Sequence, residues 1–249
     1  MFKKYNKYPT KAEQLKVIKE DGGDIRFIYN PSEEIQLAAV RQDGSSIAYI
    51  HNPSEEVQLE ALKQDGDNIR YINNPSEKVL LAAVKKDGFS IQYIDNPSKA
   101  VQLEAIKQNE DSIRYINAPS EEIQLAAVRQ DGTALEFIHN PSKEVQLEAI
   151  RQCDWAVQFI HNPSEKVKLA AVKQNGNAIQ FIHNPSEELQ LEAVKQDKYA
   201  IQFIHNPCEK VIRYLIENYF DDLRVMQSLY AKVDFKTLPN DLKLMLEVS

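Results

Sequence analysis

The chain has 249 residues, of which 43% are hydrophobic and 27% charged, and its net charge is −7 with a pI near 5.4. This acidic balance argues against a general nucleic-acid-binding protein, which normally presents a basic stripe. Two cysteines, Cys153 and Cys208, are too few for a disulfide framework. No stretch approaches the roughly 18 apolar residues of a membrane span, and the start has no apolar segment of signal-peptide length, so we expect a cytoplasmic protein without a membrane contact.

Prolines recur every 22 residues, and only Pro239 lies outside this register; the others are at 9, 31, 53, 75, 97, 119, 141, 163, 185 and 207. A fixed short period is typical of a solenoid, in which each repeat packs only on its neighbours. We count each repeat from its proline as position 1. The sequence predicts an all-α solenoid of about ten two-helix repeats: an N-terminal cap with a degenerate first repeat (1–30), regular repeats (31–206) and capping helices (207–249).

The first repeat is atypical, since Glu13 stands where other repeats carry valine or isoleucine. Each regular repeat, except the one that opens with Ala118, opens with an Asn-Pro pair, as at Asn52 and Pro53. The pair predicts an asparagine N-cap, proline at the first helical position and a capping box closed by the glutamate at position 3. The serine at position 2 is the alternative cap. The helix is expected to run about eleven residues and to stop at the glycine of position 14, the usual residue after a last turn.

The first helix carries apolar residues at positions 5, 7, 9 and 10, an arc wide enough to pack on two neighbours and on a helix beneath. Glutamine recurs at position 6 within this arc, for example Gln58. We expect a ladder of half-buried glutamines that bond backbone between repeats. Position 8 alternates between alanine and glutamate, which indicates an ancestral 44-residue duplication and places the following residues on the outer face: Glu60, Glu104, Glu148 and Glu192.

The second helix of each repeat is predicted to be short, six to eight residues and partly 3₁₀. Its positions 16, 17 and 20 are expected to face inward, as Ala200, Ile201 and Ile204 do in one repeat. Position 19 is aromatic from Phe27 to Phe203, and this spacing favours core packing.

The chain after 206 keeps one proline of the register but loses the pattern, and two further helices are predicted near 220–232 and 240–248. End repeats must close the core, which favours a capping role. Self-association of 207–249 is the alternative, favoured by Leu242, Leu244, Met245 and Leu246.

Position 15 varies while its surroundings repeat, and it shares the outward side of the short helix with positions 18 and 21. Exposed aromatic residues and arginines are the usual anchors of protein interfaces. We therefore interpret the short helices as a contact surface for a protein partner, with Phe89, Trp155 and Tyr199 as apolar anchors and Arg70 and Arg114 as cationic ones. The alternative is that these aromatic residues cover the seam between repeats where glycine is lost.

All five histidines occupy position 21, and His161, His183 and His205 of consecutive repeats join the predicted contact surface. Neighbouring helices lie ~8–10 Å apart, too far for one row of histidines to share a metal ion. No phosphate-binding loop, zinc-spaced cluster or nucleophile elbow is present, so no metal, cofactor or enzymatic activity is expected.

The Asn-Pro-Ser-Glu-Glu-Val-Gln-Leu-Glu-Ala pattern, as at residues 52–61, resembles short helical repeats of unknown function from bacteria and their phages. The long-then-short helix unit is also similar to leucine-rich variant repeats, relatives of HEAT repeats. The resemblance covers 9–206 well and 207–249 poorly. It implies a right-handed superhelix, a phage or mobile-element setting in the host cytoplasm, and a binding role that includes interference with a host system.

Three functions follow from these patterns. The first is a protein-binding module that inhibits or scaffolds a partner. The second is an acidic nucleic-acid mimic that occupies a DNA- or RNA-binding groove through its glutamate rows. The third is an enzyme related to the HEAT-like DNA glycosylases, which the acidic balance and the missing basic channel disfavour.

Overall fold

The computed structural model describes residues 10–234 and 238–247, with the side chains of 245–247 outside the described part. This described chain is all-α, made of helices in regularly repeating pairs, and it contains no strand. It divides into two compact halves, Met1–Ala127 and Val128–Ser249, which we describe one at a time. The all-α repeat architecture is confirmed, and the handedness of the superhelix stays a prediction.

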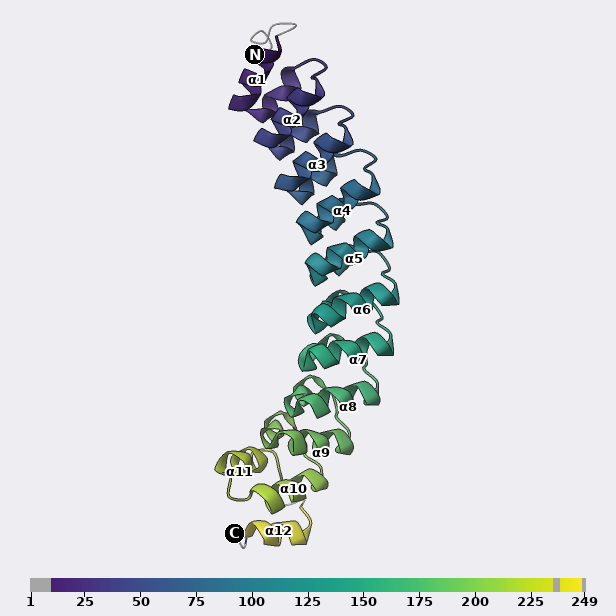
Figure 1. Cartoon of the computed structure of the whole chain (residues 1–249). Coiled ribbons are helices and arrows are strands. Elements are labelled where there is room, and N and C mark those ends of the chain that lie inside the picture. Colours follow the sequence, from purple (N-terminus) through teal and green to yellow (C-terminus); the bar gives the residue numbers. More distant parts are fainter. Residues whose placement is uncertain (1–9, 235–237, 248–249) are drawn as a thin grey trace. The chain divides into compact units, whose positions relative to one another are not determined.

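The N-terminal half alternates α-helices with 3₁₀ helices (η), and Figure 1 shows α1 to α5 side by side in chain order. Its elements are α1 (Lys11–Glu20), η1 (Gly22–Phe27), α2 (Glu33–Gln42), η2 (Gly44–Tyr49), α3 (Glu55–Gln64), η3 (Gly66–Tyr71), α4 (Glu77–Lys86), η4 (Gly88–Tyr93), α5 (Lys99–Gln108) and η5 (Glu110–Tyr115). The boundary between the halves falls inside α6 (Glu121–Gln130).

The C-terminal half continues the alternation, and three α-helices follow its last 3₁₀ helix. Its elements are η6 (Gly132–Phe137), α7 (Lys143–Gln152), η7 (Asp154–Phe159), α8 (Glu165–Gln174), η8 (Gly176–Phe181), α9 (Glu187–Gln196), η9 (Lys198–Phe203), α10 (Glu209–Tyr219), α11 (Leu223–Tyr230) and α12 (Asn240–Glu247). The predicted short 3₁₀ helices and both predicted C-terminal helices are confirmed.

Serine, rather than asparagine, caps the α-helices, so the alternative boundary was the correct one. The hydroxyl oxygen of Ser54 accepts the backbone N–H of Val57 at 3.4 Å, and α3 begins at Glu55. Asparagine does not cap because it lies two residues before the serine, in the left-handed region, where Asn52 has φ 50° and Ala118 has φ 47°. Asparagine tolerates that conformation better than other residues with a side chain.

The predicted capping box occurs in α1 instead. The side-chain oxygen of Thr10 accepts the backbone N–H of Glu13, while the Glu13 carboxylate accepts the backbone N–H of Thr10 at 2.7 Å. This capping box explains why the first repeat carries Glu13 at position 5, where the other repeats carry an apolar residue.

Glycine at position 14 opens the 3₁₀ helix rather than closing the α-helix in a left-handed conformation, since no described glycine has a positive φ. The residue before it caps the 3₁₀ helix: Asp43 Oδ1 accepts the backbone N–H of Ser45 at 2.9 Å. At Gly44 the missing side chain lets the next repeat approach closely, because a Cβ there would lie 2.8 Å from the carbonyl oxygen of Ala61. Other repeats carry a side chain at position 14, as Glu110, Asp154 and Lys198 do. The predicted C-cap role was therefore wrong.

The position-6 glutamines are half-buried as predicted, but their amides bond within their own repeat. Gln58 Nε2 donates to the carbonyl oxygen of Pro53 at 2.9 Å, and the same bond recurs in other repeats. At Gln190 the ladder between repeats does form, because its Oε1 accepts the backbone N–H of Cys208 at 2.9 Å. Position 12 supplies another hydrogen bond between repeats, because Gln64 Oε1 accepts the backbone N–H of Gly44 at 2.7 Å.

The core follows the predicted positions closely. Positions 5, 9 and 10 of the α-helices are fully buried, as in Val57, Ala61 and Leu62, whereas position 7 is half-buried. Positions 16, 17 and 20 of the short helices are buried throughout the regular repeats. Burial of this apolar surface holds six-residue 3₁₀ helices that would not be stable alone.

The last helices close this core. Val225, Met226 and Leu229 of α11 are buried against α10 and the preceding repeat, and Leu242 of α12 is also fully buried. Of the residues predicted for self-association, only Leu244 is exposed, and the side chains of Met245 and Leu246 lie outside the described part. This packing is what a capping role requires, and self-association stays a prediction, with Leu244 and also Leu223 exposed in the described part of the segment.

Candidate partner-binding surface

Position 18 is exposed in every one of these 3₁₀ helices, as predicted, whereas position 15 is exposed at Ser45, Trp155 and Tyr199 and half-buried or buried in the other repeats. Trp155 is 43% exposed and Tyr199 39% exposed, while Arg70 and Arg114 are exposed and Phe89 is half-buried. In a 3₁₀ helix, residues three apart share a face. Positions 14, 17 and 20 thus form the buried face, and positions 15, 18 and 21 form the outward one.

The aromatic residues at position 19 were predicted to be core, and this prediction was wrong. Tyr49 is 50% exposed, and exposed rings recur at Tyr71, Tyr93, Tyr115 and Phe181. Positions 16 and 19 share the third face of the 3₁₀ helix, because they are three residues apart. On this face the small residue at position 16 is buried in the core, whereas the ring at position 19 lies further from it. The aromatic row therefore adds to the outward surface.

Arginines bridge this aromatic row in the N-terminal half. The guanidinium carbon of Arg70 lies 4.8 Å from the ring centre of Tyr71 and 5.6 Å from that of Tyr93 in the next repeat. Arg26 repeats the arrangement two repeats earlier, over Phe27 at 4.7 Å and Tyr49 at 5.4 Å. Such stacks hold the cation in place beside the exposed rings.

The predicted aromatic anchors Phe89 and Trp155 differ in their contacts. Phe89 meets Tyr115 of the next repeat edge-on, with ring centres 5.9 Å apart, so it covers the seam between repeats. Trp155 packs against Phe159 of its own 3₁₀ helix at 5.9 Å. Trp155 consequently remains an exposed aromatic side chain on the outward face.

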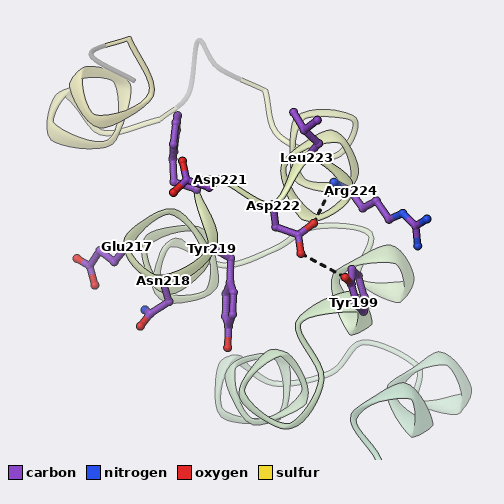
Figure 2. Close-up of a pocket in the computed structure, with 9 residues that line it drawn as sticks. Tyr199, Glu217, Asn218, Tyr219, Asp221, Asp222, Leu223 and Arg224 are labelled. Carbon is purple, nitrogen blue, oxygen red and sulfur yellow. Dashed lines mark hydrogen bonds between the residues drawn. The ribbon is translucent and has the colours of Figure 1, made fainter.

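Tyr199 lies in η9, the last 3₁₀ helix of the repeats, and contacts the C-terminal cap, as Figure 2 shows. Its hydroxyl donates to Asp222 Oδ2 at 3.2 Å, and Lys198 Nζ lies 2.7 Å from the same oxygen. The Lys198 ammonium also stands over the rings of Tyr199 and Tyr219, at 5.1 and 5.0 Å. The lysine that replaces the position-14 glycine thus attaches the last 3₁₀ helix to α11.

Asp222 connects η9 to α11 through hydrogen bonds and through its charge. Its Oδ1 accepts the backbone N–H of Arg224 at 3.1 Å and of Val225 at 3.2 Å, which caps α11. The hydrogen bond from Lys198, followed by that from Val225, lowers the pKa of Asp222 from its ordinary 3.8 to about 2. A cleft of about 640 Å³ lies beside this contact and is lined by Glu217, Tyr219 and Tyr199 among others.

The histidines of position 21 are exposed, including His161, His183 and His205. His183 and His205 line a cleft of about 400 Å³ between the last two regular repeats. Among the described residues, no three histidine, cysteine, aspartate or glutamate side chains are grouped to hold a metal ion. Burial raises the pKa of the Cys153 thiol, so this thiol is not an activated nucleophile.

The glutamate row of position 8 is less open than predicted. The side chains of Glu60 and Glu148 are 18% and 12% exposed, and each lies between two basic residues. Glu60 pairs with Lys63 at 2.5 Å and with Arg41 of the preceding repeat at 3.3 Å. These contacts neutralise much of the negative charge that a polyanion mimic would need.

In the described part of the chain, no helix is long and apolar enough to cross a membrane. Comparisons with protein-family models, with curated proteins and with solved structures found no match for this chain.

Proposed function

We propose that this chain is a non-enzymatic protein-binding repeat module that contacts its partner through the outward face of its 3₁₀ helices. Trp155 carries the proposal, because a tryptophan that is 43% exposed gives up hydrophobic stabilisation unless a partner covers it. Trp155 stands at position 15 of the short helix, where the residue type changes from repeat to repeat.

The stacked arginines support the same surface. Arg70 is held over Tyr71 and Tyr93 before any partner arrives, so less side-chain entropy is lost when it bonds a partner group. Preordered arginine and tyrosine side chains are frequent anchors of protein interfaces.

Polyanion mimicry is the weaker function, since Glu60 and Glu148 are half-buried and already paired with basic residues. No feature of the described residues favours a glycosylase-type enzyme. From the resemblance of the repeat we also propose a phage or mobile-element setting, in which the chain inhibits or scaffolds a protein in the host cytoplasm.

The test places a photo-crosslinking amino acid in place of Trp155 and, as a matched control, in place of the exposed Lys173 on α8. Illumination in lysate of the source cells should yield a defined cross-linked protein from position 155 and not from 173. Trp155→Ala should weaken capture of that protein by roughly tenfold or more, as expected of an interface anchor. Equal cross-linking at both positions would contradict the proposal.

The same capture assay separates protein binding from mimicry. Glu60→Gln with Glu148→Gln should leave capture unchanged if the 3₁₀ face is the contact. A strong loss in this double variant, together with a steep weakening by salt, would favour the mimic instead.

A further inference from the structure

A regular row of aromatic rings follows the 3₁₀ helices of the N-terminal half. Each of η1 to η5 packs on the next one, and position 19 of each carries one ring: Phe27, Tyr49, Tyr71, Tyr93 and Tyr115. The four tyrosines are between 37% and 50% exposed. The row therefore presents one ring per repeat, and all of its rings lie within a single compact half of the chain.

The arginine contacts give the spacing of these rings. The guanidinium carbon of Arg70 lies 4.8 Å from the ring centre of Tyr71 and 5.6 Å from that of Tyr93. Those two ring centres are therefore no more than ~10 Å apart, in agreement with the ~8–10 Å between packed helices. Arg26 sets the same limit for the rings of Phe27 and Tyr49. A ligand that contacts every ring must repeat its own contacts at about this spacing.

A polyproline II helix has a matching repeat. It has three residues per turn and rises about 3.1 Å per residue, so the same face returns about every 9.3 Å. An extended strand returns to the same face after about 6.7 Å, and an α-helix does so after about 5.4 Å. Either of these would place some of its contacts between the rings. A single-stranded nucleic acid is disfavoured by the net charge of −7.

The side chains of the row also suit such a helix. Proline-rich segments dock on aromatic side chains, and a polyproline II segment is largely ordered before it binds, so little conformational entropy is lost. Its carbonyl groups have no partner within the segment, and a tyrosine hydroxyl can donate to them. Phenylalanine, which replaces tyrosine at position 19 of the second half, as at Phe159 and Phe181, lacks this donor. The N-terminal half is therefore the better site.

The arginines add a charge requirement to the ligand. Position 18 carries arginine in every second repeat of this half, at Arg26, Arg70 and Arg114. Among the described residues, no carboxylate forms an ion pair with Arg70, and Asp67 of the same 3₁₀ helix accepts a serine hydroxyl of the next repeat instead. Arg114 differs, because it contacts Asp111 at 3.8 Å. Arg70 thus offers a cation, held beside two exposed rings, to an acidic residue of the ligand.

We propose that this aromatic row binds an acidic, proline-rich segment of the partner in the polyproline II conformation. The segment runs along η1 to η5 and places one turn on each ring. Because the arginines recur every two repeats, a glutamate or aspartate in every second turn, six residues apart, lies beside Arg26 and Arg70. This inference rests on the proposed protein-binding function and names the kind of partner segment that the N-terminal half recognises.

The test measures fluorescence polarisation of a labelled peptide made of three Pro-Glu-Pro-Pro-Ala-Pro units, with the full chain as its binding partner. Replacing the glutamates of the peptide by glutamine should weaken binding by roughly tenfold, as expected for lost charge-assisted hydrogen bonds. A peptide with one glutamate in every seven residues should also bind more weakly, because successive glutamates then point in different directions. A peptide with glycine in place of proline loses the preformed helix and should bind at least tenfold more weakly.

Variants of the chain locate the site. Tyr71→Ala together with Tyr93→Ala should weaken binding by roughly tenfold or more, as expected of aromatic anchors. Phe181→Ala removes an exposed ring from position 19 of the other half and is the matched control, which should bind as the parent chain does. Arg70→Gln should weaken binding of the glutamate peptide and leave that of the glutamine peptide unchanged. Arg70 is exposed, so this variant tests the site even where the tyrosine variant does not fold.

Absence of binding to the glutamate peptide at millimolar concentration would overturn the inference. Equal affinity for the proline and glycine peptides would overturn it as well, and so would an Arg70→Gln variant that still prefers glutamate over glutamine. None of these results affects a partner cross-linked at position 155, which lies in the other half of the chain, so the two proposals fail separately.

Discussion

The carbonyl oxygen of Ala83 lies 2.6 Å from the point where a side chain on Gly66 would place its Cβ. Gly66 thus allows η3 to approach α4 of the next repeat more closely than any other residue permits. Gly66→Ala should destabilise the protein by about 1–3 kcal/mol, the usual cost of forcing atoms into a packed site. Chemical denaturation measures the loss. Gly23→Ala is the control, because its nearest contact is 3.1 Å away and other repeats carry side chains at this position. Equal losses in both variants would contradict the close-approach explanation.

Ala118 adopts the left-handed conformation (φ 47°) in the place that asparagine fills elsewhere. A non-glycine residue without a polar side chain pays about 1–2 kcal/mol for this conformation. Ala118→Asn should therefore raise the free energy of unfolding by up to about 1 kcal/mol, and Asn96→Ala should lower it by a similar amount. Denaturant midpoints of the two variants should move in opposite directions; a shift of both in one direction would argue against backbone strain as the cause.

Ser46 and Ser112 are fully buried at position 16, and their hydroxyl oxygens have no hydrogen-bond partner among the described residues. Later repeats carry alanine at this position. Ser46→Ala and Ser112→Ala should be neutral or stabilising by up to about 1 kcal/mol, because an unpaired buried hydroxyl is removed. Ser90→Ala should instead destabilise by about 1 kcal/mol, since Ser90 Oγ donates to Asp67 Oδ1 at 2.9 Å. Thermal unfolding should rank the three variants in this order, and a loss at Ser46 as large as at Ser90 would refute it.

The Lys198–Asp222 contact makes the C-terminal cap sensitive to acid. The pKa of Asp222 is depressed from 3.8 to about 2 in the folded chain, so its stabilising contribution is complete above pH 3.8 and is lost as the pH falls toward 2. Asp222→Asn keeps an N-cap for α11 but removes the charge. This variant should melt below the parent chain at pH 7, and the gap should close as the pH falls from about 4 to about 2.

Asp221→Asn is the matched control for this pH series. Asp221 is exposed, and no hydrogen bond or ion pair involves its side chain within the described residues. Its melting temperature should follow that of the parent chain at every pH. A gap for Asp222→Asn that stays constant across the series would show that charge is not what the aspartate contributes.

The period of the sequence was enough to predict the fold, because each repeat packs on copies of itself. The period was not enough to predict which residues begin and end the helices. Asn52 and Ser54 are both good capping residues, and only the backbone shows that Asn52 takes the left-handed position while Ser54 caps. The sequence also allowed two roles for Gly44, a C-cap of the α-helix or a close contact between repeats. The structure shows the second, because Gly44 lies close to the carbonyl oxygen of Ala61.

The candidate surface was predicted in part. Positions 15 and 18 follow from helical geometry, but the exposure of Tyr49 depends on the tighter turn of a six-residue 3₁₀ helix. The pairing of Lys198 with Asp222 could not be predicted, because α11 has no counterpart in the repeats to align with.

Glu60 pairs with Lys63 and with Arg41 of the preceding repeat. These ion pairs constrain how many residues such a chain can gain or lose at once. Loss of one 22-residue repeat with alanine at position 8 would bring two glutamates onto adjacent helices and make them compete for the same cations. Loss of a repeat with glutamate at this position would instead place two alanines side by side and leave their basic neighbours without the glutamate. Loss or gain of two repeats together preserves every pair. Length variation by recombination should therefore proceed in multiples of 44 residues, so that the heritable module of this protein is a pair of repeats.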